Sequence, residues 1–168
     1  MEKAPLEHVT HTFVPVFDAD SRILILGTFP SVKSRESNFY YGHPQNRFWK
    51  VLALVTEDTV PETTEEKKKF LIRHHIAVWD VIESCDIVGS SDSSIRNVIP
   101  ADLTKVLEQA DIVQIYANGA KAWQLYQKYL LPVTGRDCRK LPSTSPANAS
   151  FRLDRLVREW SIIRKYTE

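Results

Sequence analysis

Short uninterrupted apolar runs alternate along the chain with longer stretches in which apolar positions recur every three or four residues. Three of the short runs are typical of strands buried on both faces, namely RILILG (22–27), IAVWDVI (76–82) and IVQIYA (112–117). A fourth strand is expected at the start of CRKLPSTSP (138–146), which then turns into a loop rich in serine and proline. The chain therefore offers four short strands for one sheet.

Helices are predicted between these strands. After Arg47, apolar residues recur at helical spacing at Phe48, Val51, Leu52 and Val55. Further helices are expected over residues 63–75, 101–110 and 119–130 and from 151 onward. Pro132 is expected to end the helix over 119–130, and residues 90–97 (SSDSSIRN) to form a polar loop.

Strands that alternate with helices indicate a parallel sheet with right-handed crossovers and helices on both faces. The expected fold class is therefore α/β, a three-layer α/β/α arrangement around a mostly parallel four-stranded sheet. Ligands bind such open sheets beyond the carboxyl ends of the strands. The site is expected to be built from residues 27–47, 79–84, 117–121 and 142–149.

The composition fits one soluble domain over residues 1–168. Apolar residues make up 43% and charged residues 26%, as in ordinary globular proteins. There is no apolar run long enough to span a membrane and no apolar segment of the secretory type near the N-terminus. We expect a cytoplasmic monomer of bacterial or archaeal type, without membrane contact.

The two cysteines, Cys85 and Cys138, are too few for a four-ligand zinc or iron–sulfur site. We expect two reduced thiols and no metal. The net charge of +1 argues against a broad basic surface. Local cationic pairs, such as Lys33 with Arg35, still suffice to bind a few phosphates.

The segment NFYYGHPQNRFWK (38–50) is too aromatic for an ordinary solvated loop, and it follows the turn GTFPS (27–31). With STSPAN (143–148), these motifs resemble the uracil-DNA glycosylase superfamily. Within it they look most like the DNA-deoxyinosine (hypoxanthine) glycosylases, and next the mismatch-specific uracil glycosylases. The resemblance is sharp over residues 24–53 and weaker over the rest of the chain.

The resemblance implies a uracil-DNA glycosylase-like domain that acts on DNA containing deaminated bases. The reaction would be monofunctional hydrolysis of the N-glycosidic bond of a flipped-out base, preferably hypoxanthine in deoxyinosine. The abasic product would enter base excision repair. No metal or other cofactor is implied, and no lysine lies within GTFPS, HPQNRFW or STSPAN to act as a lyase nucleophile.

At one catalytic position this chain differs from the uracil relatives. They carry a water-positioning Asn where this chain has Phe29. Phenylalanine cannot orient a water by hydrogen bonding, so strong uracil excision is disfavoured. Asn46 is the first candidate to take over this task. Capping of the helix that starts at Arg47 is an equal and compatible role for Asn46. Asn38 is a weaker alternative.

Two further side chains are candidates for the chemistry. Asp80, at the end of the second strand, can stabilise the sugar cation or bind water; capping of the following turn is its alternative role. His43 can act as an acid on N7 or N3 of a departing purine. A structural hydrogen bond is the alternative for His43.

The base-binding candidates lie in the same two motifs. Backbone amides at Gly27 and Thr28 are expected to face the carbonyl of the base. Tyr41 matches the aromatic that stacks on the flipped base in the uracil relatives, and Phe29 is expected to form the opposite wall. Gly42 is expected to let the ligand approach the backbone closely.

The predicted DNA-binding residues combine small hydroxyls with local cations. The Ser/Pro loop resembles the second motif of the superfamily, which pinches the phosphates. Arg47 is equally compatible with a surface salt bridge, and Asn118 with the start of a helix. The full set is Ser31, Lys33, Arg47, Asn118, Lys121, Ser143, Thr144, Ser145 and Pro146.

Three alternative functions stay open at this point. The nearest is a uracil or mismatch glycosylase with an unusual water-holding residue. A protein that binds damaged DNA without cleaving it is compatible with Phe29 in the first motif. A nucleoside hydrolase acting on free inosine is disfavoured, because the Ser/Pro loop and the clustered cations suit a polymer better than a monomer.

Overall fold

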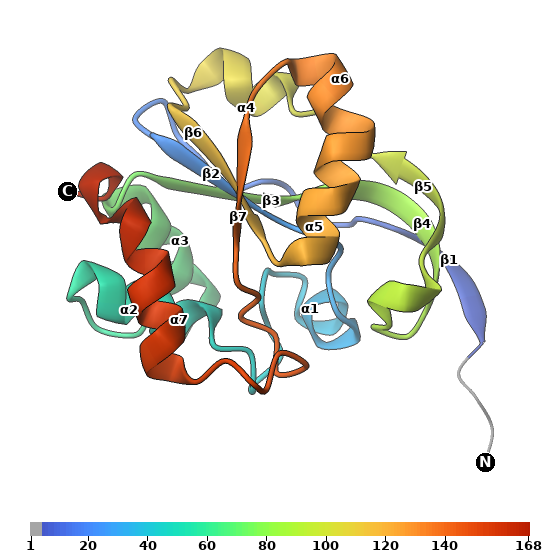
Figure 1. Ribbon diagram of the computed structural model, residues 1–168, viewed down its shortest axis with the longest axis horizontal. Coiled ribbons are helices and arrows are strands. Elements are labelled where there is room, and N and C mark those ends of the chain that lie inside the picture. The colour runs from blue at the N-terminus through green and yellow to red at the C-terminus, as the bar shows by residue number, and fades with distance from the viewer. Residues whose placement is uncertain (1–4) are drawn as a thin grey trace.

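The computed structural model describes residues 5–168, and its centre is a sheet of four parallel strands in the order β3-β2-β6-β7 (Figure 1). The strands are β2 (Ile23–Gly27), β3 (Ile76–Asp80), β6 (Gln114–Asn118) and β7 (Cys138–Leu141). Every residue of β2 and β3 is buried, as their continuous apolar sequences predict. The α/β class and the parallel four-stranded sheet are confirmed.

Helices cover both faces of this sheet. In Figure 1, α2, α3 and α7 lie on one side of the central strands, and α4, α5 and α6 on the other. The helices are α1 (Val32–Ser37), α2 (Phe48–Thr56), α3 (Thr64–Arg73), α4 (Thr104–Gln109), α5 (Ala120–Leu125), α6 (Leu131–Thr134) and α7 (Leu153–Trp160). Short 3₁₀ segments occupy Asp92–Ser94 and Ser161–Tyr166. The polar helix α1 was not predicted from the sequence.

The prediction that Pro132 ends the long helix is wrong. A π-helical segment, Tyr126–Leu130, joins α5 to α6, and the backbone N–H of Leu131 bonds to the carbonyl of Tyr126. Pro132 then lies in the first turn of α6, a position that tolerates proline. The helix ends at Gly135, which adopts a left-handed conformation with φ of 64°.

A second, antiparallel sheet was not predicted. It contains β1 (Leu6–Thr10), β4 (Ile82–Val88) and β5 (Arg96–Pro100) in the order β1-β4-β5. The predicted strand over 76–82 ends at Asp80, and β4 begins at Ile82. The predicted loop over 90–97 contains a 3₁₀ turn and the start of β5. β1 and β5 are largely exposed, so they lack the apolar runs that identify buried strands.

The ends of the central strands bring three predicted site residues to one edge. Gly27 and Asp80 are register partners in the last pair of β2 and β3, and Asn118 ends β6. Cys85 and Cys138 are buried and unpaired, as expected. Within residues 5–168, no helix is long and apolar enough to cross a bilayer.

Candidate active site

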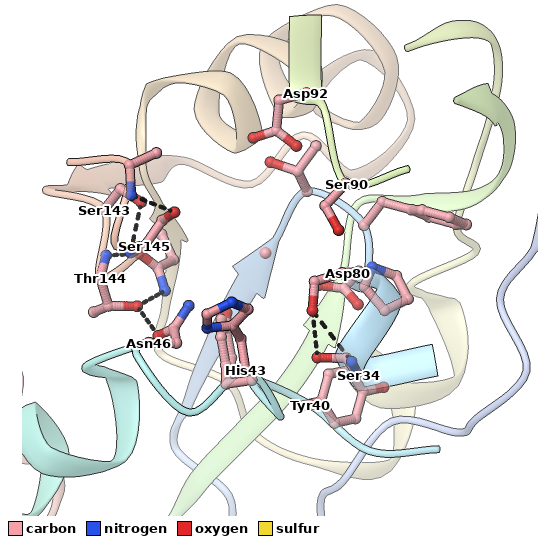
Figure 2. Close-up of a pocket in the computed structure, with 18 of the residues that line it drawn as sticks. Ser34, Tyr40, His43, Asn46, Asp80, Ser90, Asp92, Ser143, Thr144 and Ser145 are labelled. Atoms are coloured by element: carbon pink, nitrogen blue, oxygen red, sulfur yellow. Dashed lines mark hydrogen bonds between the residues drawn. The ribbon is translucent and has the colours of Figure 1, made fainter. Parts of the chain in front are cut away.

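A cavity of about 360 Å³ opens at the carboxyl edge of the central sheet. Its walls come from residues 27–31 and 143–147, from Tyr40, Tyr41, His43 and Asn46, and from Asp80 and Asn118. Figure 2 shows the Ser/Pro loop on one side, Asp80 on the other, and His43 and Asn46 reaching in between them. The structure therefore gathers the predicted segments around one hollow.

Asp80 lies deep in this cavity and is only 4% exposed. One carboxylate oxygen, Oδ2, accepts a hydrogen bond of 2.8 Å from Nε2 of His11. The other oxygen, Oδ1, lies 2.4 Å from the point where a Cβ on residue 27 would be placed. Gly27 therefore makes room for the Asp80 carboxylate, and the carboxylate is oriented by a histidine rather than by the following turn.

His11 is a site component that sequence reasoning missed. Its side chain is 1% exposed, and its ring packs against Phe13, Phe29 and Tyr40. Within the described residues, Nδ1 has no hydrogen-bond partner. His11 belongs to none of the recognised motifs, so nothing local in the sequence connects it with Asp80.

Two tyrosines border the carboxylate and stay neutral. Burial raises the pKa of Tyr40 far above its ordinary value, and the Asp80 charge raises it further. The same two causes raise the pKa of Tyr41. The Tyr41 ring stacks on Phe48 with centroids 3.8 Å apart, so one of its faces is already covered. Tyr41 does line the cavity, and base stacking on its other face stays a prediction.

The carboxamide of Asn46 has a fixed orientation. Its Oδ1 accepts hydrogen bonds from the backbone N–H of Phe48 at 3.0 Å and from the Thr144 hydroxyl at 2.8 Å. Its Nδ2 makes no hydrogen bond within residues 5–168 and points toward the open cavity in Figure 2. Asn46 lies one residue before the N-cap of α2, Arg47, and satisfies the N–H of the first helical residue from there. Its NH₂ group is left as a donor to the site.

His43 presents a second donor. The backbone N–H of Gln45 donates to its Nδ1 at 3.1 Å, so in the neutral ring the proton lies on Nε2. The ring extends into the cavity next to Asn46 (Figure 2). Two side chains from one aromatic loop therefore offer N–H groups on the same side of the hollow.

The Ser/Pro loop is held from within the protein. Thr144 is fully buried, and its N–H donates to Oδ1 of Asn118 at 3.0 Å. Nδ2 of Asn118 donates back to the Thr144 hydroxyl, also at 3.0 Å. Asn118 therefore anchors the loop, and it ends β6 rather than starting a helix. A phosphate contact by Asn118 stays a prediction.

Arg47 has a similar anchoring role. Its guanidinium donates to the carbonyl oxygens of Ser145 and Asn148, each at 3.1 Å, and to that of Phe151. Within residues 5–168 Arg47 forms no salt bridge, and its contact with a phosphate stays a prediction. The guanidinium fork instead fixes the shape of the loop.

Three other predicted residues lie outside the cavity. Gly42 donates its N–H to the Ser34 hydroxyl at 2.9 Å, and a Cβ there would meet Ser37, so Gly42 packs against α1 rather than against a ligand. Lys33 is exposed and pairs with Glu36 at 3.6 Å. Lys121, on α5, does not line the cavity either.

The remaining predicted residues line the cavity, and they are Thr28, Phe29, Ser31, Ser143, Ser145 and Pro146. Phe29 is only 9% exposed, and its ring meets His11 edge-on and lies under Arg35. Most of the Phe29 ring therefore packs inside the protein. Only the small exposed part of the Phe29 ring is left to form the wall that was expected opposite Tyr41.

Asp92 was also missed, because residues 90–97 read only as a polar loop. It lies at the mouth of the cavity, where Figure 2 shows its carboxylate turned inward. Loss of hydration raises the pKa of Asp92; Lys121 opposes this and Asp80 adds to it. Within residues 5–168, no group of three or more histidine, cysteine, aspartate or glutamate side chains is placed to hold a metal ion.

Comparison with known proteins gives a consistent assignment. A sequence model of the uracil DNA glycosylase superfamily matches residues 14–164. A protein of Methanosarcina acetivorans named hypoxanthine DNA glycosylase is 33% identical over 156 residues, which cover 92% of this chain and 97% of the relative. A protein of the same name from Methanosarcina barkeri is 31% identical over 138 residues, which cover 81% of this chain and 86% of the relative.

A solved structure agrees with these relatives. The solution NMR structure of a candidate uracil DNA glycosylase from Methanosarcina acetivorans superposes with a TM-score of 0.79 at 32% identity. The match covers 93% of this chain and 97% of that one. The chain belongs to the uracil DNA glycosylase superfamily.

Proposed function

We propose that this protein is a monofunctional DNA glycosylase that removes hypoxanthine from deoxyinosine and leaves an abasic site for base excision repair. The names of the two archaeal relatives support this substrate. The observation that carries the proposal is the chemistry of the cavity. A buried carboxylate, Asp80, lies across from two side-chain N–H donors, on His43 and Asn46.

The donors match the base. Hypoxanthine presents O6 and N7 as neighbouring acceptors, whereas adenine presents an amino group beside N7. Donors on Asn46 and His43 therefore favour hypoxanthine over adenine, and they stabilise the charge that develops on the departing base. Because Oδ1 of Asn46 already accepts two hydrogen bonds, Asn46 acts on the base rather than on the attacking water.

Asp80 takes the role of holding the water. The C1′–N9 bond breaks, and its electron pair leaves with the base. The oxygen of the water bonds to C1′, and the water's proton passes to the Asp80 carboxylate. His11 keeps that carboxylate in place through Oδ2, which leaves Oδ1 for the water. No lysine among residues 5–168 lines the cavity, which supports hydrolysis over a lyase reaction.

In this proposal the enzyme is a monomer that acts in the cytoplasm, on the DNA of the nucleoid. Deaminated bases pair weakly, so extruding them from the duplex costs less than extruding a normal base. In this proposal Ser143 and Ser145 contact the phosphates next to the extruded nucleotide. Their place in the lining of the cavity, on a loop fixed by Arg47, supports this role.

The test is a cleavage panel of duplexes carrying deoxyinosine, deoxyuridine, deoxyxanthosine or ethenoadenine, followed by alkali to break abasic sites. Cleavage at deoxyinosine with the highest rate supports the proposal, and preference for deoxyuridine replaces it with the uracil glycosylase alternative. Binding of the duplexes without cleavage of any of them indicates a damage-binding module. Release of hypoxanthine from free inosine but not from DNA indicates a nucleoside hydrolase.

A further inference from the structure

Deamination changes one group at position 6 of adenine from a hydrogen-bond donor to an acceptor. A site that reads this change needs a donor that stays a donor. A carboxamide is ambiguous in this respect, because rotation by half a turn exchanges its NH₂ for its oxygen. If Asn46 turned in this way, it would accept from the amino group of adenine and lose its discrimination.

We propose that Thr144 and Asn118 fix Asn46 in its donating orientation and thereby determine the specificity for the deaminated base. This inference rests on the proposed function and adds two positioning residues to it. The three side chains form a relay, Asn118 to Thr144 to Asn46, with links of 3.0 Å and 2.8 Å.

Backbone N–H groups set the direction of the relay at both ends. The N–H of Thr144 can only donate, so the atom of Asn118 that it meets is the oxygen. Nδ2 of Asn118 must then donate to the Thr144 hydroxyl. The hydroxyl has one hydrogen, which it gives to Asn46. At the other end, the N–H of Phe48 also requires the oxygen of Asn46 to face it.

Burial makes this direction costly to reverse. Thr144 is 0% exposed and Asn118 is 9% exposed, so water does not substitute readily for a lost partner. With Asn46 reversed, its NH₂ group would face the N–H of Phe48 and the hydroxyl of Thr144. Both of these donors would then lose their acceptor. Unpaired buried polar groups are among the more expensive local defects in a protein.

The relay also connects recognition of the base with the Ser/Pro loop. Thr144 lies between Ser143 and Ser145, which line the cavity, and its carbonyl accepts from the backbone N–H of Arg47 at 3.1 Å. A displaced loop would therefore remove one of the two hydrogen bonds that hold the Asn46 oxygen and leave only the bond from Phe48. The donor is fully fixed only while the loop has the shape seen here.

The experiment compares single-turnover excision from duplexes that carry deoxyinosine or deoxynebularine, a purine with hydrogen in place of O6. Thr144→Val removes the hydroxyl at nearly constant volume. Asn118→Asp replaces the donor to Thr144 by an acceptor, which turns the hydroxyl hydrogen away from Asn46. Each change is expected to lower the inosine-to-nebularine rate ratio about tenfold, the effect of one well-placed hydrogen bond. Thr144→Ser keeps the hydroxyl and is expected to keep the ratio within about threefold of wild type.

A double-mutant cycle separates this role from a general loosening of the loop. In an Asn46→Ala background, Thr144→Val is expected to change the ratio by less than about twofold, because the group that it positions is gone. An unchanged ratio in the two single variants, or an equal loss in both backgrounds, overturns the relay while leaving the glycosylase assignment intact. Absence of inosine cleavage by the wild-type protein overturns both. If Thr144→Val does not fold, Asn118→Asp gives the same comparison.

Discussion

The carboxylate of Asp80 occupies the space that a side chain on residue 27 would need. Its Oδ1 lies 2.4 Å from the ideal Cβ position on Gly27, a distance that no real contact of this kind tolerates. The hydroxyl of Tyr41 lies 3.0 Å from the same point. The glycine that opens the first motif thus shapes the site by admitting an acidic side chain from the neighbouring strand.

Gly27→Ala tests this relationship. The added methyl group is expected to displace the Asp80 carboxylate and to slow inosine excision about 100-fold, since a catalytic group moved by about 1 Å loses its alignment. Single-turnover kinetics on a deoxyinosine duplex measure the effect.

Gly135→Ala is the matched control for that change. Gly135 has φ of 64° and nothing within 4 Å of its Cβ position, so alanine there strains the backbone far from the cavity. It is expected to lower the free energy of unfolding by about 1 kcal/mol and to leave excision unchanged. Equal loss of activity in both variants would mean that Gly27→Ala acts through stability and not through Asp80.

His11 is expected to support catalysis without touching DNA. His11→Leu leaves one oxygen of the buried Asp80 without its donor, and the single-turnover rate should fall about tenfold to 100-fold. His11→Gln retains an N–H donor and should recover part of the rate. The Kd for a duplex with a stable abasic-site analogue should stay within about twofold in both variants. A weakened Kd with an unchanged rate would instead place His11 in DNA binding.

Arg47→Lys tests whether Arg47 anchors the Ser/Pro loop or binds a phosphate of the DNA. The lysine keeps the charge but cannot bond three carbonyls at once, so the Ser/Pro loop should loosen and the free energy of unfolding should fall by about 1–3 kcal/mol. Binding of the duplex by the folded protein should not weaken, because the guanidinium faces carbonyl oxygens rather than phosphates. Unchanged stability together with weaker binding of the duplex would show that Arg47 contacts the backbone of DNA after all.

Asp58 makes stability depend on pH. Hydrogen bonds from His74 and Arg73 lower the pKa of Asp58 below its ordinary value. Its stabilising effect is therefore present above the unfolded pKa of about 4 and is lost as the pH falls toward the lower folded value.

Urea unfolding of Asp58→Asn checks the sign of this pH dependence of stability. The variant should be about 1 kcal/mol less stable than wild type at neutral pH, with a smaller difference near pH 3. Glu65→Gln is the control, because the Glu65 side chain is 79% exposed beside Lys69 and should contribute little at either pH. A difference that grows as the pH falls would contradict the assignment.

The central sheet was predictable because buried parallel strands carry continuous apolar runs. The antiparallel sheet was not, because the residues of β1 and β5 are mostly exposed and β5 contains Asn97 and Pro100. The helix past Pro132 depends on a π-helical turn that no local pattern indicates. In each case, packing rather than local propensity decides the structure.

The candidate site was predicted in part. The motifs located Asn46, Asp80 and His43 correctly in one cavity, since they share the carboxyl edge of the sheet. They did not reveal His11, whose contact with Asp80 spans 69 positions of sequence. The directions in which side chains point could not be predicted from the motifs either. Arg47 and Asn118 turn inward to the Ser/Pro loop because its buried polar groups need partners.

The central claim is that this cavity excises hypoxanthine by means of Asp80 and the donor on Asn46. The most direct measurement is the release of free hypoxanthine, detected by mass spectrometry, from a deoxyinosine duplex with enzyme in excess. We predict release by the wild-type protein, and rates at least about 100-fold lower for Asp80→Asn and Asn46→Ala. No release by the wild type, or release that both variants match, would contradict the claim.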